Sequence, residues 1–310
     1  MAMKKLEERM ILVATDEGLH VAHGAGASRV DDLAGRAVGA LAAADACWYA
    51  IVEGRELWRS ADGRRWLMTA KLPRKAATCL AATPAGLLVG SARAHLLRLE
   101  GDQLVRLPSF DEAEGRKEWY TPWGAPADVR SISAGAAGSL YVNVHVGGVL
   151  RSTDAGASWH PMLDIEHDVH QVLAPPAHPG LVLVAAYDGF GVSEDGGETW
   201  RWENTGLHAH YCRAVALAGD TVLLSASAGH HGRRAAVYRR ALRGSAPFER
   251  CRDPLPEWFV DNVDTGCLTA AGPAVALGTE DGSVFRSPDA GAHWDVVVKG
   301  LAPVRAVTFV

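Results

Sequence analysis

Three arginines and one histidine, residue types that bind anions or transfer protons, occupy the same place in four short segments of the chain. They are Arg130, His170, Arg213 and Arg305, at the centre of residues 128–132, 168–172, 211–215 and 303–307. A guanidinium group offers a planar pair of donors to a carboxylate or a phosphate. The three arginines are therefore candidate ligand-binding residues for an anion. The alternative is that each arginine pairs with a neighbouring aspartate and fills the space between the segments, because gathered charges need partners.

Carboxylates recur two residues before this position. Asp128 and Asp168 precede Arg130 and His170 in this way, and Asp264 stands at the equivalent place in residues 264–268. We take Asp128 as a candidate ligand contact. Asp264 is a candidate catalytic carboxylate, since a carboxylate beside a histidine favours proton transfer.

Histidine is concentrated in the middle of the chain, where nine of the 13 histidines lie between positions 145 and 231. Neutral imidazoles with a nearby carboxylate bind divalent transition metals such as Zn, Fe or Cu. His145, His170 and His210 are therefore a candidate metal site. General acid–base catalysis by His170 and His210 with Asp264 is one alternative. A hydrogen-bonded polar lining around water is the other.

Two loops rich in aromatic residues lead into these segments. Residues 110–126 contain Trp123, and residues 254–262 contain Trp258. Aromatic side chains at the rim of a pocket suit a sugar ring or an aromatic ligand, and loops over a rigid scaffold commonly carry function. The alternative is that the tryptophans pack across the ends of the strands. The other candidate ligand contacts rest on their position near the segments, and they are Asn143, Tyr187 and Tyr211.

A repeated motif, Ser-x-Asp-x-Gly-x-Thr-Trp, indicates how these segments are positioned. Residues 193–200 are its plainest copy, residues 152–159 and 287–294 keep its Ser, Asp, Gly and Trp, and residues 60–66 form a shorter copy. The four serines are 92, 41 and 94 residues apart. These gaps are close to two, one and two units of about 40–47 residues, the size of a four-stranded propeller blade. Blades without the motif in the long gaps and at the start bring the expected total to seven.

The motif resembles the Asp-box, or BNR, repeat of sialidase-like and glycosyl-hydrolase-like β-propellers, among them a group of small bacterial proteins. The resemblance covers nearly the whole chain and implies an all-β, seven-bladed propeller with four-stranded antiparallel blades. The aspartate of the box accepts hydrogen bonds from its own turn, and the glycine takes a positive φ. We therefore expect the box aspartates to be structural.

The resemblance implies a sialidase site only in part. Arg130, Arg213 and Arg305 are similar to the carboxylate-binding arginine triad of sialidases, and Tyr187 and Tyr211 are candidates for the nucleophile by location. The Arg-Ile-Pro signature of true sialidases is absent, so authentic sialidase activity is not expected. The chain is also similar to the Asp-box propellers of photosystem assembly factors, which are binding platforms. A non-catalytic protein-binding scaffold is thus the alternative to a protein that binds a small ligand, with or without transforming it.

The repeat also predicts strand order and closure. In the blade with the plainest motif, strands are expected at residues 168–174, 181–186, 190–193 and 199–203, from the channel outward. The N-terminal strand 10–14 then lacks an inner neighbour, which the C-terminal strand 304–310 can supply, removing an open sheet edge. We expect one propeller domain over residues 1–310, with residues 1–9 as a flexible or capping extension. Propellers bind ligands in the funnel at the channel mouth, where the charged positions would lie.

Composition limits the partners. Lys and Arg number 31 and Asp and Glu 36, a net charge of −5, which argues against nucleic-acid binding. The N-terminus is charged without an apolar signal segment, no stretch is long enough to span a membrane, and the five cysteines are scattered like reduced thiols. We expect a cytoplasmic protein with no nucleic-acid or membrane partner and no nucleotide cofactor. Its expected ligand is a small carboxylate, phosphate or sugar.

Overall fold

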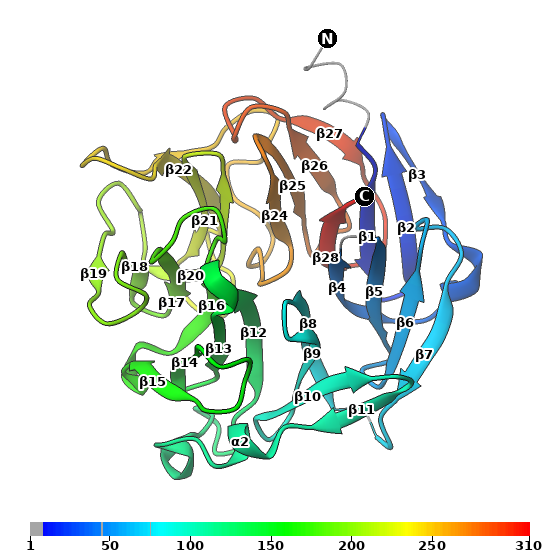
Figure 1. Cartoon of the computed structure of the whole chain (residues 1–310). Coiled ribbons are helices and arrows are strands. Elements are labelled where there is room, and N and C mark those ends of the chain that lie inside the picture. Colours follow the sequence, from blue (N-terminus) through cyan, green and yellow to red (C-terminus); the bar gives the residue numbers. More distant parts are fainter. Residues whose placement is uncertain (1–8, 45, 75) are drawn as a thin grey trace.

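The computed structural model describes residues 9–44, 46–74 and 76–310. These residues form seven four-stranded antiparallel sheets, arranged as blades around a common centre (Figure 1). The predicted all-β, seven-bladed propeller is confirmed. Most of the expected N-terminal extension lies outside the described residues; of it, exposed Arg9 donates from Nη1 to Ala271 O at 3.4 Å.

The blades are numbered in chain order, starting from the one that contains β1. Their strands are given from the channel outward. Blade 1 contains β28 (Val304–Phe309), β1 (Ile11–Thr15), β2 (Gly18–His23) and β3 (Gly26–Arg29). Blade 2 contains β4 (Val38–Ala44), β5 (Cys47–Val52), β6 (Glu56–Ser60) and β7 (Leu67–Lys71). Blade 3 contains β8 (Ala77–Thr83), β9 (Gly86–Ser91), β10 (His95–Glu100) and β11 (Gln103–Arg106). Blade 4 contains β12 (Val129–Ala134), β13 (Leu140–Val144), β14 (Gly148–Ser152) and β15 (His160–Leu163).

The remaining three blades repeat this order. Blade 5 contains β16 (Val169–Leu173), β17 (Val182–Ala186), β18 (Gly189–Ser193) and β19 (Arg201–Trp202). Blade 6 contains β20 (Tyr211–Ala218), β21 (Thr221–Ser227), β22 (Ala236–Ala241) and β23 (Glu249–Arg250). Blade 7 contains β24 (Leu268–Ala271), β25 (Ala274–Gly278), β26 (Val284–Ser287) and β27 (Asp295–Val298). Between blades 3 and 4 lies the short helix α2 (Pro108–Asp111).

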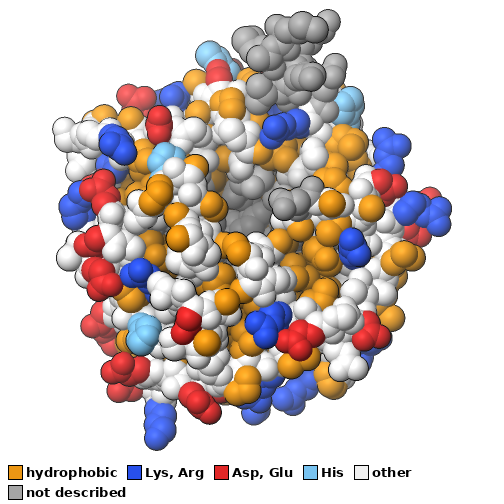
Figure 2. All heavy atoms as spheres, viewed as in Figure 1, with side chains coloured by type: hydrophobic (Ala, Val, Ile, Leu, Met, Phe, Trp, Pro, Cys, Tyr) orange, Lys and Arg blue, Asp and Glu red, His pale blue; other side chains and the backbone are white. Residues whose placement is uncertain are grey.

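The hydrophobic core lies between neighbouring blades. Each inner strand contacts the inner strand of the next blade, and β24 contacts β28 to complete the circle. The second strands β13, β17 and β25 are buried at every residue, because neighbouring blades cover both of their faces. In the view of Figure 2, charged side chains lie mainly around the outer edge of the disc, and hydrophobic side chains lie nearer its middle. Among the described residues, no helix is long and apolar enough to cross a membrane.

The repeated motif forms the turn between the third and fourth strands of its blade. In blade 5, Ser193 Oγ accepts from Gly197 N at 2.8 Å, and Asp195 Oδ1 accepts from Thr199 N at 2.9 Å. Trp200 Nε1 closes the turn by donating to Gly197 O at 2.8 Å. Hydrogen bonds from Thr199 lower the pKa of Asp195 to about 2. The motif aspartate therefore stabilises its own turn as a carboxylate.

The strand bounds predicted for blade 5 agree with the structure to within two residues at each end. In blade 7, by contrast, residues 264–267 do not belong to the inner strand. They form a turn in which Cys267 N donates to Asp264 O at 2.9 Å and Gly266 has a φ of 86°. Asp264 thus lies on a turn, and β24 begins only at Leu268.

The two ends of the described chain close the propeller. Strand β28 pairs with β1 from Ile11↔Phe309 to Thr15↔Val304, and it buries Val304, Ala306, Val307 and Phe309. Trp48 of blade 2 also donates to Phe309 O at 3.2 Å. The expected closure of blade 1 by the C-terminal strand is confirmed, and it covers the edge of β1.

Deleting residues 304–310 should unfold the protein or greatly lower its melting temperature. The deletion removes four buried apolar side chains, together worth roughly 5 kcal/mol, and it exposes the edge of β1. Such a loss is comparable with the whole stability of many domains. Thermal unfolding and size-exclusion chromatography measure the effect. In contrast, Val307→Ala retains the strand and should cost only about 1–2 kcal/mol. A truncated protein that melts within a few degrees of the full chain would show that β28 is dispensable.

An ion cluster around the buried carboxylate of Glu56 stabilises blade 2. Glu56 is only 7% exposed, and its carboxylate accepts from Arg36 Nη2 and Lys71 Nζ, each at 2.6 Å. Trp58 Nε1 donates to the same carboxylate at 3.1 Å. Burial alone would raise the pKa of Glu56, but the hydrogen bonds from Lys71, Arg36 and Trp58 outweigh burial and lower it to about 2.

Acid should therefore destabilise the protein through Glu56. Its folded pKa lies below the ordinary value of 4.5, so its contribution is full above pH 4.5 and is lost as the pH falls towards 2. The contribution is about 3 kcal/mol. Urea unfolding from pH 6 to pH 3 should show a smaller pH dependence for Glu56→Gln than for the wild type. Glu100→Gln is the matched control, because Glu100 is paired with Arg98 at an exposed position. Identical pH profiles for Glu56→Gln and the wild type would contradict the assignment.

Candidate functional site

A β-bulge interrupts the ladder at the same level of six described inner strands. There the second strand pairs with the residues on both sides and skips the residue between them. The skipped residues are Gly39 in β4, Thr78 in β8, Arg130 in β12, His170 in β16, Arg213 with Ala214 in β20, and Arg305 in β28. A bulge re-aims the side chain of the extra residue. The equivalence found in the sequence is thus an equivalence of backbone geometry. We call Arg130, His170, Arg213 and Arg305 the polar ring.

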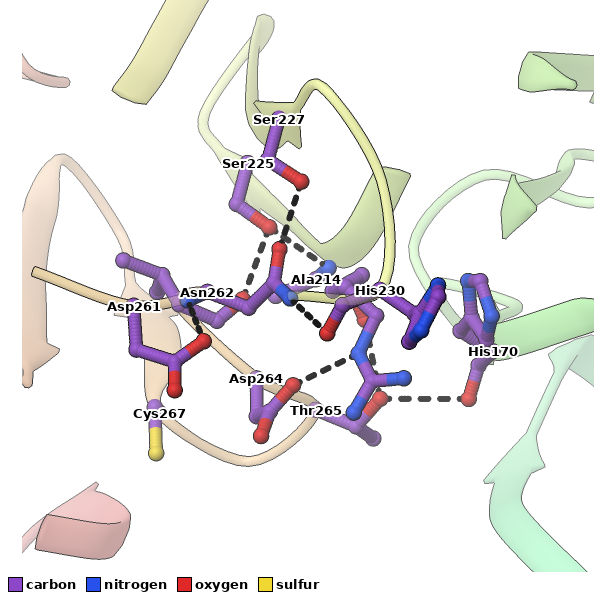
Figure 3. A network of polar contacts seen from close by, with 12 residues as sticks. His170, Ala214, Ser225, Ser227, His230, Asp261, Asn262, Asp264, Thr265 and Cys267 are labelled. Atoms are coloured by element: carbon purple, nitrogen blue, oxygen red, sulfur yellow. Dashed lines mark hydrogen bonds and ion pairs between the residues drawn. The ribbon is translucent and has the colours of Figure 1, made fainter. Parts of the chain in front are cut away.

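In blade 7, the inner strand β24 pairs regularly with β25, and the contact with the neighbouring bulges comes from a threonine that precedes the strand. Thr265 lies in the turn before β24, and its hydroxyl donates to Arg213 O at 2.8 Å and lies 3.1 Å from His170 O (Figure 3). One side chain of blade 7 therefore contacts the bulges of blades 5 and 6. This contact fixes the relative position of two members of the polar ring.

Bulged residues of five blades line a cavity of about 720 Å³ along the central channel, which we call the channel cavity; His170 and Asp168 lie behind its lining. Blades 2 and 3 contribute small or apolar residues to it, at 39–43 and 78–82. The charged and aromatic residues of the lining come from blades 1, 4, 6 and 7 and from the loop before blade 4. The predicted site residues that line the cavity are Trp123, Asp128, Arg130, His145, Arg213, Asp264 and Arg305.

Two of the three arginines already have carboxylate partners. Arg305 binds Asp16 through Nε at 2.8 Å and Nη2 at 2.5 Å, and Glu280 through Nη1 at 2.6 Å. The hydrogen bonds to Asp16 raise the pKa of Arg305. Arg213 Nε donates to Asp264 at 2.6 Å, and its Nη1 donates to Tyr211 Oη at 3.2 Å. For these two arginines, the alternative of pairing with acidic neighbours describes the structure.

Arg130 is different. Among the described residues, its guanidinium has no ion-pair or hydrogen-bond partner, and its Nη1 is buried. Burial and the positive charge of Arg213 lower the pKa of Arg130, although arginine remains charged at neutral pH. Buried polar groups almost always have partners, so an unpaired one calls for an explanation. Arg130 is the ring arginine whose donors remain available to an anion.

Two histidines and one carboxylate lie beside Arg130. Asp168 is 3.6 Å from His145 Nε2 and 3.7 Å from His170 Nε2, too far for hydrogen bonds. Burial, together with the charges of Arg130 and Arg213, lowers the pKa of His145 to about 3 and the pKa of His170 well below its ordinary value. Burial raises the pKa of Asp168, against the attraction of Arg130. Both imidazoles are therefore neutral at physiological pH.

The tautomer of His170 follows from its backbone contact. His170 Nδ1 lies 2.5 Å from Cys212 O, and a carbonyl oxygen can only accept, so Nδ1 carries the proton. Nε2 of the neutral ring is then a bare acceptor. Nε2 is buried without a partner, as is Asp168 Oδ1. Next to the donor of Arg130, the site thus presents two acceptors that also lack partners.

Asp168 is held in an uncommon backbone conformation. Its φ of 38° and ψ of 69° lie in the left-handed region, which side-chain-bearing residues rarely adopt. Its N–H donates to Ile165 O at 3.1 Å, and its carbonyl accepts from Tyr187 N at 3.2 Å. Backbone strain of this kind persists where surrounding contacts enforce it and is frequent at functional sites. It places the carboxylate between the two histidines.

Aromatic residues surround this group. The ring of Trp123 meets His145 edge-on at 4.9 Å, and the ring of Tyr211 lies 4.8 Å from His170. Tyr187 contacts Tyr211 edge-on at 6.0 Å. Trp123 and Tyr187 are 68% and 60% exposed, far more than most large hydrophobic residues of this chain. We call Trp123, Tyr187 and Tyr211 the aromatic rim.

Three predicted site residues lie elsewhere or have other contacts. Asn143 is fully buried; it donates to Val169 O at 2.6 Å and accepts from Ser131, so it joins blades 4 and 5 and has no free group for a ligand. Trp258 packs on His208 at 4.8 Å and lines a second cavity together with residues of β22 and β23, so this part of the loop 254–262 lies on the outer side of blade 6. His210 is exposed at the start of β20.

The candidate metal ligands do not form a group of three. His145 and His170 share Asp168, whereas no contact joins His210 to either of them. Within the described part of the chain, no cluster of three or more His, Cys, Asp or Glu side chains has an arrangement suited to a metal ion. The two histidines near Asp168 instead form a neutral polar pair.

Sequence reasoning assigned no role to several residues of the site. Asp168 precedes His170 as Asp128 precedes Arg130, but nothing in the sequence shows its strained backbone. Glu280 follows the second strand of blade 7 as His145 follows that of blade 4, so the alignment of blades could have identified it as a partner of Arg305. Asp16 follows β1, and the predicted pairing of β1 with the last strand could have placed it beside Arg305.

Replacing Asn143 by leucine should destabilise the fold without changing ligand binding in the channel cavity. The substitution leaves Val169 O buried without its donor, which costs about 1–3 kcal/mol. Urea unfolding measures the loss, and the melting temperature with and without a channel ligand measures binding. Unchanged stability would show that Asn143 is not the structural link between blades 4 and 5.

Comparison with known proteins gives the fold and no closer relationship. No protein-family model matches the chain, and no curated protein matches it. Three similar solved structures, each 13% identical in sequence, are described as "YCF48 bound to D1 peptide", an ancestral GH74 enzyme and the WD40 β-propeller domain of Doa1. Their TM-scores are 0.57, 0.61 and 0.64, and the alignments cover 95%, 96% and 95% of this chain. They cover 88%, 39% and 88% of the respective neighbours. At this identity, the likeness shows a shared propeller fold.

Proposed function

We propose that the mouth of the channel cavity binds a small anionic ligand through Arg130. The observation that supports this proposal is the buried Arg130 Nη1, which lacks a partner while the other ring arginines are paired with carboxylates. A buried donor without a partner costs about 1–3 kcal/mol, and more when it is charged. A bound carboxylate or phosphate would remove that cost. It would also accept two parallel hydrogen bonds from the guanidinium group.

Two hydrogen-bond acceptors near Arg130 indicate which further groups the ligand carries. His170 Nε2 and Asp168 Oδ1 need donors, and they lie beside the charge of Arg130. A ligand with a hydroxyl or amino group next to its acid group would pair with both kinds of site. Hydroxy acids, amino acids, sugar acids and sugar phosphates meet this description. The aromatic rim supplies flat apolar surfaces that suit the rest of such a ligand.

Arg130→Gln should weaken binding of an anionic ligand at least tenfold. Thermal-shift screening of hydroxy acids, amino acids, sugar acids and sugar phosphates identifies a ligand, and calorimetry then gives its affinity for wild type and variant. The substitution removes a charge-assisted pair, worth about 1.5–3 kcal/mol. Arg201→Gln is the matched control, since Arg201 is an exposed arginine of β19.

Two results would contradict the proposal. One is a screen in which no compound of these classes raises the melting temperature of the wild type. The other is a ligand whose affinity is the same for Arg130→Gln and the wild type. A channel ligand that binds more weakly to Arg130→Gln but equally to Arg201→Gln supports it.

The alternative is that the channel mouth binds a segment of another protein. The exposure of Trp123 and Tyr187 favours this alternative, because exposed aromatic residues are enriched at protein interfaces. One structural neighbour is described as bound to a peptide. In this case, no compound of the small-molecule screen would raise the melting temperature. Trp123→Ala would then weaken binding of a partner protein without affecting the stability of the propeller.

A further inference from the structure

A second cavity, of about 810 Å³, lies on the outer flank of blade 6. It is bounded by β22 and β23, by the loop that enters β20, and by Gly291 and Ala292 in the motif turn of blade 7. No described residue lines both this cavity and the channel cavity. Its volume is typical of small-molecule sites, which run from about 300 to 1,000 Å³.

The lining of this cavity is strongly basic. Four arginines line it, against one carboxylate, that of Glu249, so the lining carries a net charge of +3. The protein as a whole has a net charge of −5. We call this cavity the arginine pocket, and its arginines are Arg234, Arg239, Arg250 and Arg252.

These guanidinium groups are not neutralised by the protein. Across residues 9–44, 46–74 and 76–310, none of the four has a carboxylate within ion-pair distance. The hydrogen bond of Arg250 Nη1 goes to a carbonyl, Glu257 O, at 3.4 Å. By contrast, Arg240 of the same blade is paired with Glu203 and packs against Phe248. The donors of the four pocket arginines therefore remain open to an external anion.

A tryptophan holds two of the arginines in place. The guanidinium carbons of Arg234 and Arg250 each lie 4.7 Å from the centre of the Trp258 ring. Stacking on an aromatic face fixes the plane of a guanidinium group and leaves its N–H edge free to donate. Two parallel donors in a fixed plane match two oxygens of a phosphate. The contact thus lowers the entropy that these side chains would lose on binding.

A half-buried histidine with a buried ring nitrogen adds an independent indication of a ligand. His208 lines the arginine pocket, its Nδ1 lies 2.6 Å from Tyr238 Oη, and its Nε2 is buried without a hydrogen-bond partner. When the Tyr238 hydroxyl donates to Nδ1, Nε2 carries the proton and is a donor. An anion in the pocket would accept this hydrogen bond together with those of the arginines.

We propose that the arginine pocket binds a phosphorylated small molecule through its phosphate group. A single carboxylate would leave most of the positive lining unbalanced, whereas a phosphate ester carries nearly two negative charges and three acceptor oxygens. The cavity is larger than a phosphate ion, so there is room for the organic part of the ligand.

The test uses inorganic pyrophosphate as the probe, titrated calorimetrically into the full chain at constant ionic strength. Pyrophosphate should bind at a site that requires Arg250 and Arg252, whether or not a second phosphate binds in the channel cavity. Arg250→Gln and Arg252→Gln should each lower its affinity at least tenfold. Arg252 is exposed, so its substitution tests the pocket even if the loss of the Arg250 contact with Trp258 disturbs the loop. Melting temperatures of the free variants verify that each is folded.

Two control variants distinguish binding in the arginine pocket from binding elsewhere on the chain. Arg243→Gln removes the same charge from an exposed loop of blade 6 that does not line the pocket, and Arg130→Gln removes the unpaired arginine of the channel cavity. Arg243→Gln should bind pyrophosphate as the wild type does, and Arg130→Gln should retain the binding that depends on Arg250 and Arg252. An equal loss in Arg243→Gln would show a nonspecific effect of charge, and a loss confined to Arg130→Gln would place the anion in the channel. Either result, or no binding to the wild type, would overturn the proposal. The test is independent of any ligand of the channel cavity.

Discussion

The β-bulge of the inner strands is the constraint on which the channel mouth depends. A regular strand alternates its side chains between two faces, and in a propeller both faces are covered by neighbouring blades. Charged residues at such positions would be buried between hydrophobic surfaces. In six of the described inner strands, the bulge leaves a residue unpaired with the second strand; Arg130 and Arg305 thereby line the channel cavity, whereas His170 stays buried against blade 6. The backbone thus creates the positions, and the side chains of each blade decide what they contain.

The side chains at the bulge positions differ from blade to blade in their charge and in their ion-pair partners. Arg305 and Arg213 receive carboxylates from Asp16, Glu280 and Asp264, which makes them part of the wall. Arg130 has no carboxylate within ion-pair distance among the described residues, and Asp128 at the edge of its blade accepts instead from Arg93 N at 3.1 Å. Of the three ring arginines, Arg130 alone lacks a partner within the part of the chain that the structure describes, and it lies beside the neutral His145 and His170. A uniform ring of charge would bind anions anywhere in the channel, whereas this distribution singles out one place.

The fold could be predicted from the sequence because it repeats. Four motif copies at multiples of one blade length fix the number of blades, and the unpaired strand at residues 10–14 fixes the closure. The same alignment found the bulge positions without identifying them as bulges. The partners of these residues come from other blades, and register across blades is not encoded in the repeat. For this reason the repeat suggests Asn143 as a ligand contact although it joins two blades, and it suggests Trp258 at the channel although Trp258 lies on the outer side of blade 6.

The ion pair of Asp16 with Arg305 joins residues 289 positions apart. During synthesis, β28 leaves the ribosome after the other described strands. Until then β1 has an open edge, and the wall of the channel cavity lacks its seventh inner strand. Blades 2 to 7 can form in order as they emerge, but the circle cannot close before the last strand is released. The nascent chain therefore passes through a state with an exposed strand edge, and such an edge is prone to aggregation until the last strand covers it.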